Sequence, residues 1–320
     1  MRVLVTGGTG FLGKHLLPKL TNYEVWAPSS RELNVTDPQC VWNVIGFNPD
    51  VILHMAALCG GILANKNSPA DFLHKNIDMA SNIFHCAQAV QFKRILNKTE
   101  SPRVYTLGSV CAYPKFCPVP FKEDDLWNGY PEETNAPYGM AKRLQLMLGQ
   151  TYRQQYGIGG AHLIPVNLYG EHDHFDLTNS HVIPALIRKF DNAIDNGLPI
   201  VECWGTGEAT REFLYAGDAA EAIAKAITTG FDTDQPINLG TGKEISIKNL
   251  ANLIGELTGF KGDIVFNGTV SDGQPKRMLD VSRAREMLGW TAETDFKTGL
   301  LKTIQWFRDN KQAIVAADAS

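Results

Sequence analysis

Met1-Arg-Val-Leu-Val-Thr-Gly-Gly-Thr-Gly-Phe-Leu-Gly13 opens the chain and decides its fold class. Its apolar, β-branched run Arg2–Thr6 predicts a strand buried on both faces. Gly7, Gly10 and Gly13 follow at regular spacing, and residues 11–20 have the pattern of a helix. A strand, a glycine-rich turn and a helix N-terminus together predict a site for a dinucleotide pyrophosphate, because glycine lets the backbone approach the phosphates. An ordinary β–α turn is the alternative.

The composition is that of a folded protein with a large core. The 320 residues are 44% hydrophobic and 20% charged, which favours one large domain and a smaller one. A net charge of −4 gives no general attraction to nucleic acid or to an anionic membrane, and no apolar run is long enough to cross a bilayer. Because we find no signal-peptide layout after Met1 and expect the six cysteines to be free thiols, we expect a cytoplasmic protein.

Strands and helices alternate over the first half of the chain. Strands are expected at residues 2–6, 23–27, 50–54, 103–107 and 161–166, and helices at 11–20, 37–45, 71–90 and 137–156. This alternation predicts an α/β fold, a doubly wound parallel (Rossmann) sheet, with a second, smaller α/β substrate domain. We expect the first domain at residues 1–166 and about 212–240, and the second, interleaved with it, at about 167–211 and 241–320.

The choice between the two nicotinamide cofactors is expected at the end of the second strand. NAD-selective sites usually place an acid there, ~20 residues after the glycines, for the ribose 2′-hydroxyl. Here Ser29, Ser30 and Arg31 occupy this place, and they suit a 2′-phosphate. This pattern favours NADPH. In the alternative, the three residues form a solvated turn and Glu32 bends back to the ribose.

A phenol and an ammonium are predicted to lie on one face of a helix. Tyr138 and Lys142 are four residues apart in the expected helix 137–156. A nearby Lys⁺ and a cationic nicotinamide would favour the phenolate, so that Tyr138 could exchange protons near neutral pH. Ser109 follows the strand 103–107 and could bind the same substrate oxygen. A surface tyrosine above a solvated lysine is the alternative.

These motifs resemble those of the extended short-chain dehydrogenase/reductase family, and the resemblance covers essentially the whole chain. Its more specific stretches are Gly60-Gly-Ile62, Ala64-Asn65, Pro69-Ala-Asp-Phe72, Gly108-Ser-Val-Cys-Ala-Tyr-Pro-Lys115, Asn167-Leu-Tyr-Gly170, Asn179-Ser-His-Val-Ile-Pro-Ala-Leu186, Trp204-Gly-Thr-Gly207, Arg211-Glu-Phe-Leu214, Asp272-Gly273 and Arg277-Met-Leu-Asp280. Within the family the chain closely resembles members that epimerise GDP-4-keto-6-deoxy-D-mannose at C3 and C5 and reduce C4 with NADPH, giving GDP-L-fucose.

The resemblance implies a role for one thiol and one imidazole. The C3 and C5 protons of a 4-keto sugar are acidic, and epimerisation needs a base on one face and an acid on the other. By similarity, Cys111 is the base and His181 the acid, while Ser109, Tyr138 and Lys142 hold the C4 oxygen. By residue type alone, Cys111 could instead be a core thiol, and His181 a helix-start residue bonded to backbone.

The same resemblance implies the remaining contacts. The expected cofactor residues are Gly7, Gly10, Phe11, Leu12, Gly13, Ser29, Ser30, Arg31, Ala56, Ala57, Tyr138, Lys142 and His181. The expected residues for the GDP-sugar are Asn167, Lys189, Trp204, Arg211 and Asp280, with Arg277 as an additional candidate. Members of the family pair as dimers, so a homodimer through helices near 71–90 and 137–157 is expected.

Some features of the sequence lie outside this pattern. Some relatives carry an Arg in the glycine loop, where Thr9 stands here, and Gly139 costs helix propensity of about 1 kcal/mol without an evident functional reason. His172 and His174 could suggest a metal site, but the chemistry needs none and we expect none. A Cys111–Cys117 disulfide is possible in principle. The rival functions are the same chemistry on a related GDP-sugar such as a 6-deoxy-heptose, one half of that chemistry, and a non-catalytic sensor.

Overall fold

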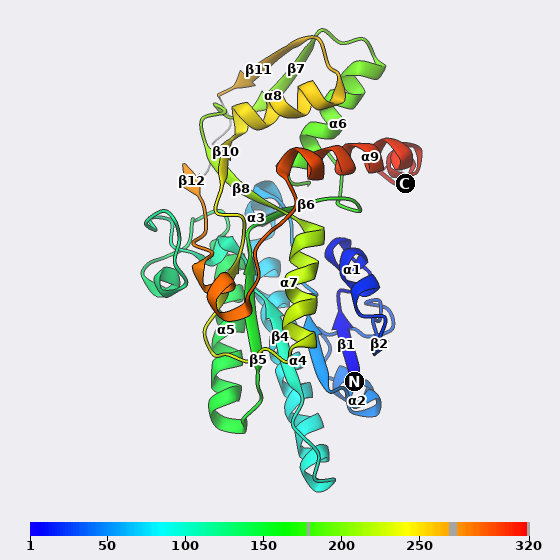
Figure 1. Ribbon diagram of the computed structural model, residues 1–320, viewed down its shortest axis with the longest axis vertical. Helices are drawn as coiled ribbons and strands as arrows, with labels where there is room; N and C mark the ends of the chain where they lie inside the picture. The colour runs from blue at the N-terminus through cyan, green and yellow to red at the C-terminus, as the bar shows by residue number, and fades with distance from the viewer. Residues whose placement is uncertain (178–179, 269–273, 319–320) are drawn as a thin grey trace.

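The centre of the molecule is a six-stranded parallel sheet with the strand order β2-β1-β3-β4-β5-β9 (Figure 1). Its strands are β1 (Arg2–Thr6), β2 (Glu24–Trp26), β3 (Val51–His54), β4 (Arg103–Leu107), β5 (Gly160–Pro165) and β9 (Ile237–Leu239). This computed structural model describes residues 1–177, 180–268 and 274–318. The direction of winding reverses between β1 and β3, and ligands of such sheets bind at the carboxyl ends of the strands there. The doubly wound sheet confirms the predicted fold class.

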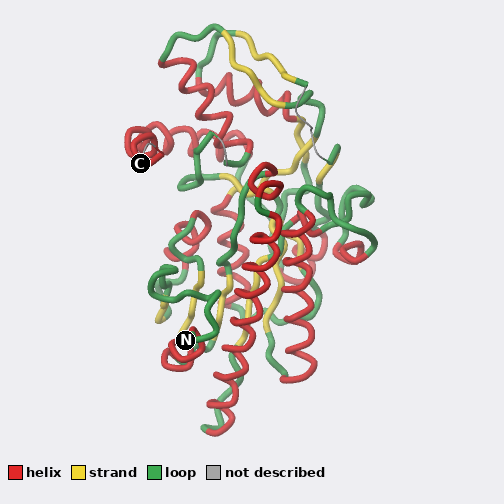
Figure 2. The backbone as a smooth tube through the Cα atoms, turned by 180° about the vertical axis from the view of Figure 1, so that it is seen from behind, coloured by secondary structure: helices red, strands yellow, loops and turns green. Residues whose placement is uncertain are grey.

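Helices cover both faces of this sheet because successive strand residues point to opposite faces. Leu4 and Ile52 pack with α2 (Cys40–Phe47) and α4 (Pro69–Leu96), whereas Val3 and Val5 pack on the face covered by α1 (Phe11–Leu16) and α7 (Ala216–Thr228). The long helix α5 (Ala136–Tyr156) lies beside α4, as seen from behind in Figure 2. None of the helices in the described part of the chain has both the length and the apolarity needed to cross a bilayer.

A second group of elements lies beyond the carboxyl ends of the central strands (Figure 1). It contains a four-stranded sheet of β6 (Asn167–Tyr169), β8 (Thr210–Tyr215), β10 (Glu244–Ser246) and β12 (Lys276–Arg277), a parallel pair of β7 (Ile200–Trp204) and β11 (Asp263–Asn267), and the helices α6 (Val182–Asp195), α8 (Ile247–Thr258) and α9 (Phe296–Asp318). These elements have their own hydrophobic core, centred on Phe190, Leu250, Leu300 and Phe307. Short helical turns are η1 (Leu17–Lys19), α3 (Ile62–Asn67), η2 (Val110–Ala112), η3 (Glu123–Trp127) and the π-turn Ala284–Leu288.

The structure differs from the expected elements mainly in short segments. The segment between β3 and α4 contains the short helix α3, and the helix expected at 71–90 extends from Pro69 to Leu96. β6 and β12 were not expected, because their two or three residues are specified by pairing with β8 rather than by local pattern. At the C-terminal end, α9 continues to Asp318. Asn179, Asp272 and Gly273 of the family-like stretches lie outside the described residues.

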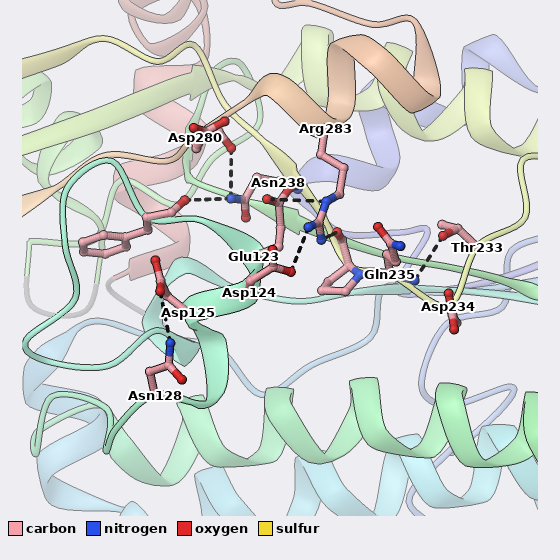
Figure 3. A network of polar contacts seen from close by, with 12 residues as sticks. Glu123, Asp124, Asp125, Asn128, Thr233, Asp234, Gln235, Asn238, Asp280 and Arg283 are labelled. Carbon is pink, nitrogen blue, oxygen red and sulfur yellow. Dashed lines mark hydrogen bonds and ion pairs between the residues drawn. The ribbon is translucent and has the colours of Figure 1, made fainter.

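A buried polar network ties the loop after β4 to the segment after β12 (Figure 3). The Asn238 side chain in the middle of β9 donates to the carbonyls of Phe121 and Asp280, both at 3.0 Å, and its backbone N–H donates to Glu123 at 2.9 Å. Arg283 reaches back to the acidic residues of this loop. These contacts fix the loop that carries Cys111 relative to β12.

Candidate active site

Gly7 and Gly13, in and after the turn that follows β1, have no room for a side chain. Gly7 has φ +75°, and a Cβ there would lie 2.7 Å from the Ala56 nitrogen. A Cβ on Gly13 would lie 2.1 Å from the Gly8 carbonyl oxygen. Gly10 caps α1, whose first residues are Phe11 and Leu12. A turn without side chains between a strand end and a helix N-terminus fits the pyrophosphate of a dinucleotide.

The turn after β3 closes this loop from the other side of the switch point. The Ala56 N–H donates to the Thr6 hydroxyl at 3.4 Å, and the Met55 N–H donates to the Thr6 carbonyl at 3.1 Å. Ala57 follows directly, and both alanines are half-buried.

In the turn after β2, the carboxylate of Glu32 and the guanidinium of Arg31 have different surroundings. Glu32 accepts hydrogen bonds from the backbone N–H and the hydroxyl of Ser29, both at 2.8 Å, and these bonds lower the pKa of the Glu32 carboxyl. Ser30 and Arg31 are exposed. The carboxylate is thus held by the turn itself, while the guanidinium of Arg31 lies open to solvent beside it.

Tyr138, Lys142 and Ser109 come together at the carboxyl end of β4. The Ser109 hydroxyl hydrogen-bonds Tyr138, and Lys142 Nζ lies 5.7 Å from the centre of the Tyr138 ring. Lys142 Nζ donates to the Leu107 carbonyl at 2.9 Å, which fixes the ammonium below the ring. The structure also explains Gly139, since a Cβ there would lie 2.4 Å from the Cys111 carbonyl oxygen. Glycine therefore lets α5 approach the segment that carries Ser109 and Cys111.

The protonation of Tyr138 differs from the expectation. Burial, and next the charge of Cys59, raise the pKa of Tyr138 well above its ordinary value. Burial lowers the pKa of Lys142 to about 8. The expected lowering of the phenol pKa by Lys142 is therefore wrong for the protein without ligand, because both groups are desolvated and the ammonium is bound to a carbonyl. Tyr138 is held as a phenol, ready to donate its proton.

Cys111 lies beside a buried guanidinium. The thiol is half-buried in η2, where the Cys111 N–H donates to the Ser109 side chain at 3.2 Å. Arg277 Nη1 donates to the sulfur at 3.6 Å, and Arg277 Nε donates to Gln274 at 2.9 Å. Arg277 is only 8% exposed. A cation in this position stabilises negative charge on sulfur. All six cysteines are free thiols, so no Cys111–Cys117 disulfide is present.

His181 precedes α6 and meets a second thiol. It hydrogen-bonds Cys59, whose sulfur also lies 3.7 Å from the Tyr138 hydroxyl oxygen. The hydrogen bond to Cys59, opposed by desolvation and supported by the charges of Cys59 and Asp173, raises the pKa of His181 to about 9. Packing of protein around the Cys59 thiol would raise its pKa, but the hydrogen bond and charge of His181 outweigh this, and the pKa is lowered. Both side chains are open to solvent on one side.

Three of the residues considered for the GDP-sugar share one face of the four-stranded sheet. Arg211 on β8 lies opposite Arg277 on β12, and Asn167 on β6 lies opposite Phe213, two residues further along β8. In-register neighbours and residues two apart project to the same face. This face therefore includes the arginine that contacts Cys111. The Asn167 side chain donates to the Glu212 carbonyl at 2.9 Å.

The other two lie apart from this face. Lys189 Nζ lies 4.8 Å above the Trp204 ring and donates to the Glu202 carbonyl at 3.0 Å, so these two residues form a cation–π pair, with Trp204 53% exposed. Asp280 belongs to the network of Figure 3, and its carboxylate accepts from the Ser282 N–H at 2.9 Å, which lowers its pKa. Asp280 is thus engaged in its own turn.

Two residues of the site were missed by the sequence reasoning. Cys59 follows β3 by five residues, and its place after the carboxyl end of a central strand was the available signal. Asp173 was considered only as part of a metal pattern. It is buried, its Oδ2 has no hydrogen-bond partner among the described residues, and burial raises its pKa to about 6. In the described part of the chain no three His, Cys, Asp or Glu residues are grouped so as to hold a metal ion.

Comparison with known proteins gives the family. The model of the NAD dependent epimerase/dehydratase family matches residues 3–240. The GDP-L-fucose synthase of Escherichia coli (strain K12) is 37% identical over 97% of this chain and 97% of its own length. The crystal structure of a GDP-L-fucose synthetase from Naegleria fowleri bound to NADP has a TM-score of 0.84 at 27% identity, over 97% of this chain and 95% of that one. A GDP-6-OMe-4-keto-L-xylo-heptose reductase from C. jejuni has a TM-score of 0.85 at 27% identity, over 97% and 98%.

The chain belongs to the NAD dependent epimerase/dehydratase family. It is an enzyme that uses a nicotinamide cofactor, and the expected resemblance to short-chain dehydrogenases/reductases that act on nucleotide sugars is confirmed. The glycine-rich turn described above fits this cofactor, because a Cβ at Gly7 would collide with the Ala56 backbone and one at Gly13 with the Gly8 backbone.

Proposed function

We propose that the chain is a 3,5-epimerase and 4-reductase that converts GDP-4-keto-6-deoxy-D-mannose to GDP-L-fucose. The observation that carries the proposal is the meeting of two proton-exchanging groups at one phenol. Burial raises the pKa of Tyr138, and the nearby charges of Cys59 and Cys111 raise it further, while Cys59 also hydrogen-bonds His181. A plain reductase needs the phenol alone, whereas an epimerase needs a base and an acid beside it.

In the epimerase half, Ser109 and Tyr138 hold the C4 carbonyl oxygen by hydrogen bonds. These bonds stabilise the negative charge that develops on this oxygen when a neighbouring C–H bond is broken. Cys111, with Arg277 at 3.6 Å, removes the protons from C3 and C5. His181, held as a cation, returns a proton to the opposite face of each centre.

In the reductase half, the same phenol donates its proton to the C4 oxygen. The raised pKa keeps Tyr138 protonated until it reacts, and the Lys142 ammonium, 5.7 Å from the ring centre, stabilises the negative charge of the phenolate that forms when the proton leaves. Gly7, Gly10, Phe11, Leu12 and Gly13 would hold the cofactor, which would supply the hydride for C4 when bound. Ala56, Ala57, Tyr138, Lys142 and His181 would border its nicotinamide half.

We further infer that this cofactor is NADPH. Arg31 is exposed beside Ser30, while Glu32 is bound by Ser29, so a 2′-phosphate would meet a free cation and an already satisfied carboxylate. The fucose synthetase from Naegleria fowleri, which resembles the chain over nearly its full length, has NADP bound.

For the GDP moiety we propose Arg211 and Asn167 near the sugar, and Lys189 with Trp204 further out. Arg211 lies in register with the arginine that contacts the reacting thiol, which supports a place beside the pyrophosphate. This cation–π pair combines an ammonium, which could bind a phosphate, with an indole ring, on which a base could stack. Asp280 is proposed only as a partner of the ribose, since its carboxylate already binds the Ser282 N–H.

One alternative substrate is a related GDP-4-keto sugar, such as a heptose, on which the chain performs both halves of the chemistry or only one. The similarity of the chain to a heptose reductase of C. jejuni supports this alternative. Purified protein should be incubated with NADPH and either GDP-4-keto-6-deoxy-D-mannose or the heptose analogue, and the products identified by NMR. GDP-L-fucose as the main product supports the proposal, and turnover of the heptose alone contradicts it.

We also propose a cytoplasmic homodimer and the two interleaved domains stated above. Apolar side chains of Phe92, Ile95 and Leu96 are exposed on α4, and Met147 is exposed on α5, so these helices could pair with a second copy. Sedimentation should give twice the chain mass of 35.3 kDa. The mass of a single chain at micromolar concentration would contradict the homodimer.

A further inference from the structure

Cys59 connects the two groups that donate protons in the proposed function. Its sulfur hydrogen-bonds the His181 imidazole, and it lies 3.7 Å from the Tyr138 hydroxyl oxygen. The three residues come from different parts of the fold: the turn after β3, the start of α6 and the first turn of α5. The thiol therefore joins residues from the central sheet, from α5 and from the start of α6.

The environment of His181 contains further charges. Asp173, from the loop after β6, is buried, its Oδ2 lacks a partner among the described residues, and its charge acts on His181. His174 donates its backbone N–H to Asp173 Oδ1 at 2.8 Å. On α5, the Lys142 ammonium acts on Cys59. The Cys59 thiol and the Asp173 carboxyl thus act on the imidazole, and the Lys142 ammonium acts on the thiol.

We propose that Cys59 is a positioning residue for His181: as a thiolate paired with the imidazolium, it keeps the acid of the epimerase protonated and directed toward the sugar. The proposal rests on the proposed function for the meaning of that acid. The pairing itself moves one proton, from the thiol sulfur to the imidazole nitrogen. It adds a second active-site thiol with a task opposite to that of Cys111, since one sulfur takes substrate protons and the other retains a proton on histidine.

The physical reason is the balance of charges. Without a partner, a histidine enclosed by protein loses its proton more easily because the cation is desolvated. The bond to Cys59 and the charges of Cys59 and Asp173 reverse this, and the pKa of His181 rises to about 9. Its imidazolium thus dominates at neutral pH. If the thiolate were removed, the pKa of His181 should fall toward the ordinary value of ~6.5.

The first test reads the imidazole directly. The His181 resonances, assigned by their loss in His181→Gln, should be titrated by NMR in the parent, Cys59→Ser and Cys59→Ala. Serine is close in size but does not ionise, so both variants should lower the midpoint of His181 by more than one pH unit. Cys117→Ser is the matched control, because burial raises the pKa of Cys117 to about 12 and keeps it neutral. An unchanged midpoint in Cys59→Ser overturns the proposal.

The second test reads the reaction. Exchange of solvent deuterium into the 4-keto sugar should be followed against pH. The alkaline limit of the rate should move to lower pH by at least one unit in Cys59→Ser, and Cys59→Asp, which restores a negative charge, should return it toward the parent. A uniform loss of rate without a shift would show a merely structural role. If the parent shows no exchange, the proposed function fails, whereas the NMR titration still decides the pairing.

Discussion

At the scale of single residues, the charges around two sulfur atoms organise the site. The Arg277 guanidinium lies 3.6 Å from Cys111, so negative charge is stabilised where the proposed chemistry needs a base. Cys59 and Asp173 stabilise positive charge on His181, which is the acid of the proposed chemistry. Neighbours rather than residue types thus separate the two roles.

A prediction at this scale concerns Arg31. Because its exposed guanidinium is proposed to bind the 2′-phosphate, Arg31→Ala should raise KM for NADPH by about 10- to 100-fold, the worth of one charge-assisted hydrogen bond, and leave KM for NADH unchanged. Steady-state kinetics with both cofactors measure this, with the exposed Arg285→Ala as control. A parent enzyme that prefers NADH would contradict the assignment.

The candidate site residues proposed from the sequence stand in recognisable motifs, and the structure brings Ser109, Cys111, Tyr138 and His181 into one region. Sequence reasoning did not find Cys59, because a lone cysteine in a loop acquires meaning only through the partners that the fold supplies. The direction of the Tyr138 pKa shift in the protein without ligand was also not predicted, because local sequence does not show that the phenol is buried, and burial raises its pKa.

At the scale of elements, the packing of α5 on η2 determines how close the phenol and the thiol can be. Gly139 is the residue that permits this approach, since a Cβ would lie 2.4 Å from the Cys111 carbonyl oxygen. The same helix contains Gly149, where a Cβ would lie 3.5 Å from the Phe84 ring, in ordinary contact. Alanine at either position gains helix propensity, but only at Gly139 would it also disturb the packing, so the two positions distinguish these effects.

We predict opposite signs for alanine at these two positions. Both substitutions gain helix propensity of about 1 kcal/mol. Gly139→Ala should nevertheless lower the free energy of unfolding by roughly 1–2 kcal/mol, because displacing η2 costs more than this gain, whereas Gly149→Ala should be neutral or stabilising. Denaturant titrations measure both values. A stabilised Gly139→Ala protein with full activity would show that the contact is unimportant.

The regular elements could be predicted because their signals are local. β1, β3 and β4 are apolar runs bounded by turns, and α5 has a helical period with Pro137 in its first turn. The small sheet could not be predicted in the same way. β12 has two residues, and only its pairing with β8, far away in the chain, makes it a strand.

At the scale of the whole molecule, a row of buried polar side chains crosses the central sheet. Thr6, His54, Thr106 and His162 lie in register on four adjacent strands. Each threonine hydroxyl is 2.8 Å from the Nδ1 atom of its histidine partner. Burial, followed by the charge of Lys142, lowers the pKa of both histidines to about 3, so both are neutral in the folded protein.

This row predicts destabilisation by acid. Below pH ~6.5 the unfolded chain binds protons at His54 and His162 that the folded chain rejects, so stability present above pH ~6.5 is lost as the pH falls toward 3, by roughly 1.4 kcal/mol per pH unit for each histidine. His162→Asn should remove about half of this slope between pH 6 and 4, and the exposed His85→Asn should remove none. Equal slopes in the parent and His162→Asn would contradict the prediction.

The proposed function requires one site in which the C–H bonds at C3 and C5 are broken and the C4 ketone between them is then reduced. The most direct measurement is NMR of GDP-4-keto-6-deoxy-D-mannose incubated with the protein in D₂O, first without and then with NADPH. The account predicts deuterium at both C3 and C5 before any cofactor is oxidised, at least about 100-fold slower in Cys111→Ser although that variant still binds NADPH. Oxidation of NADPH without deuterium at either carbon would contradict it and leave a plain reductase.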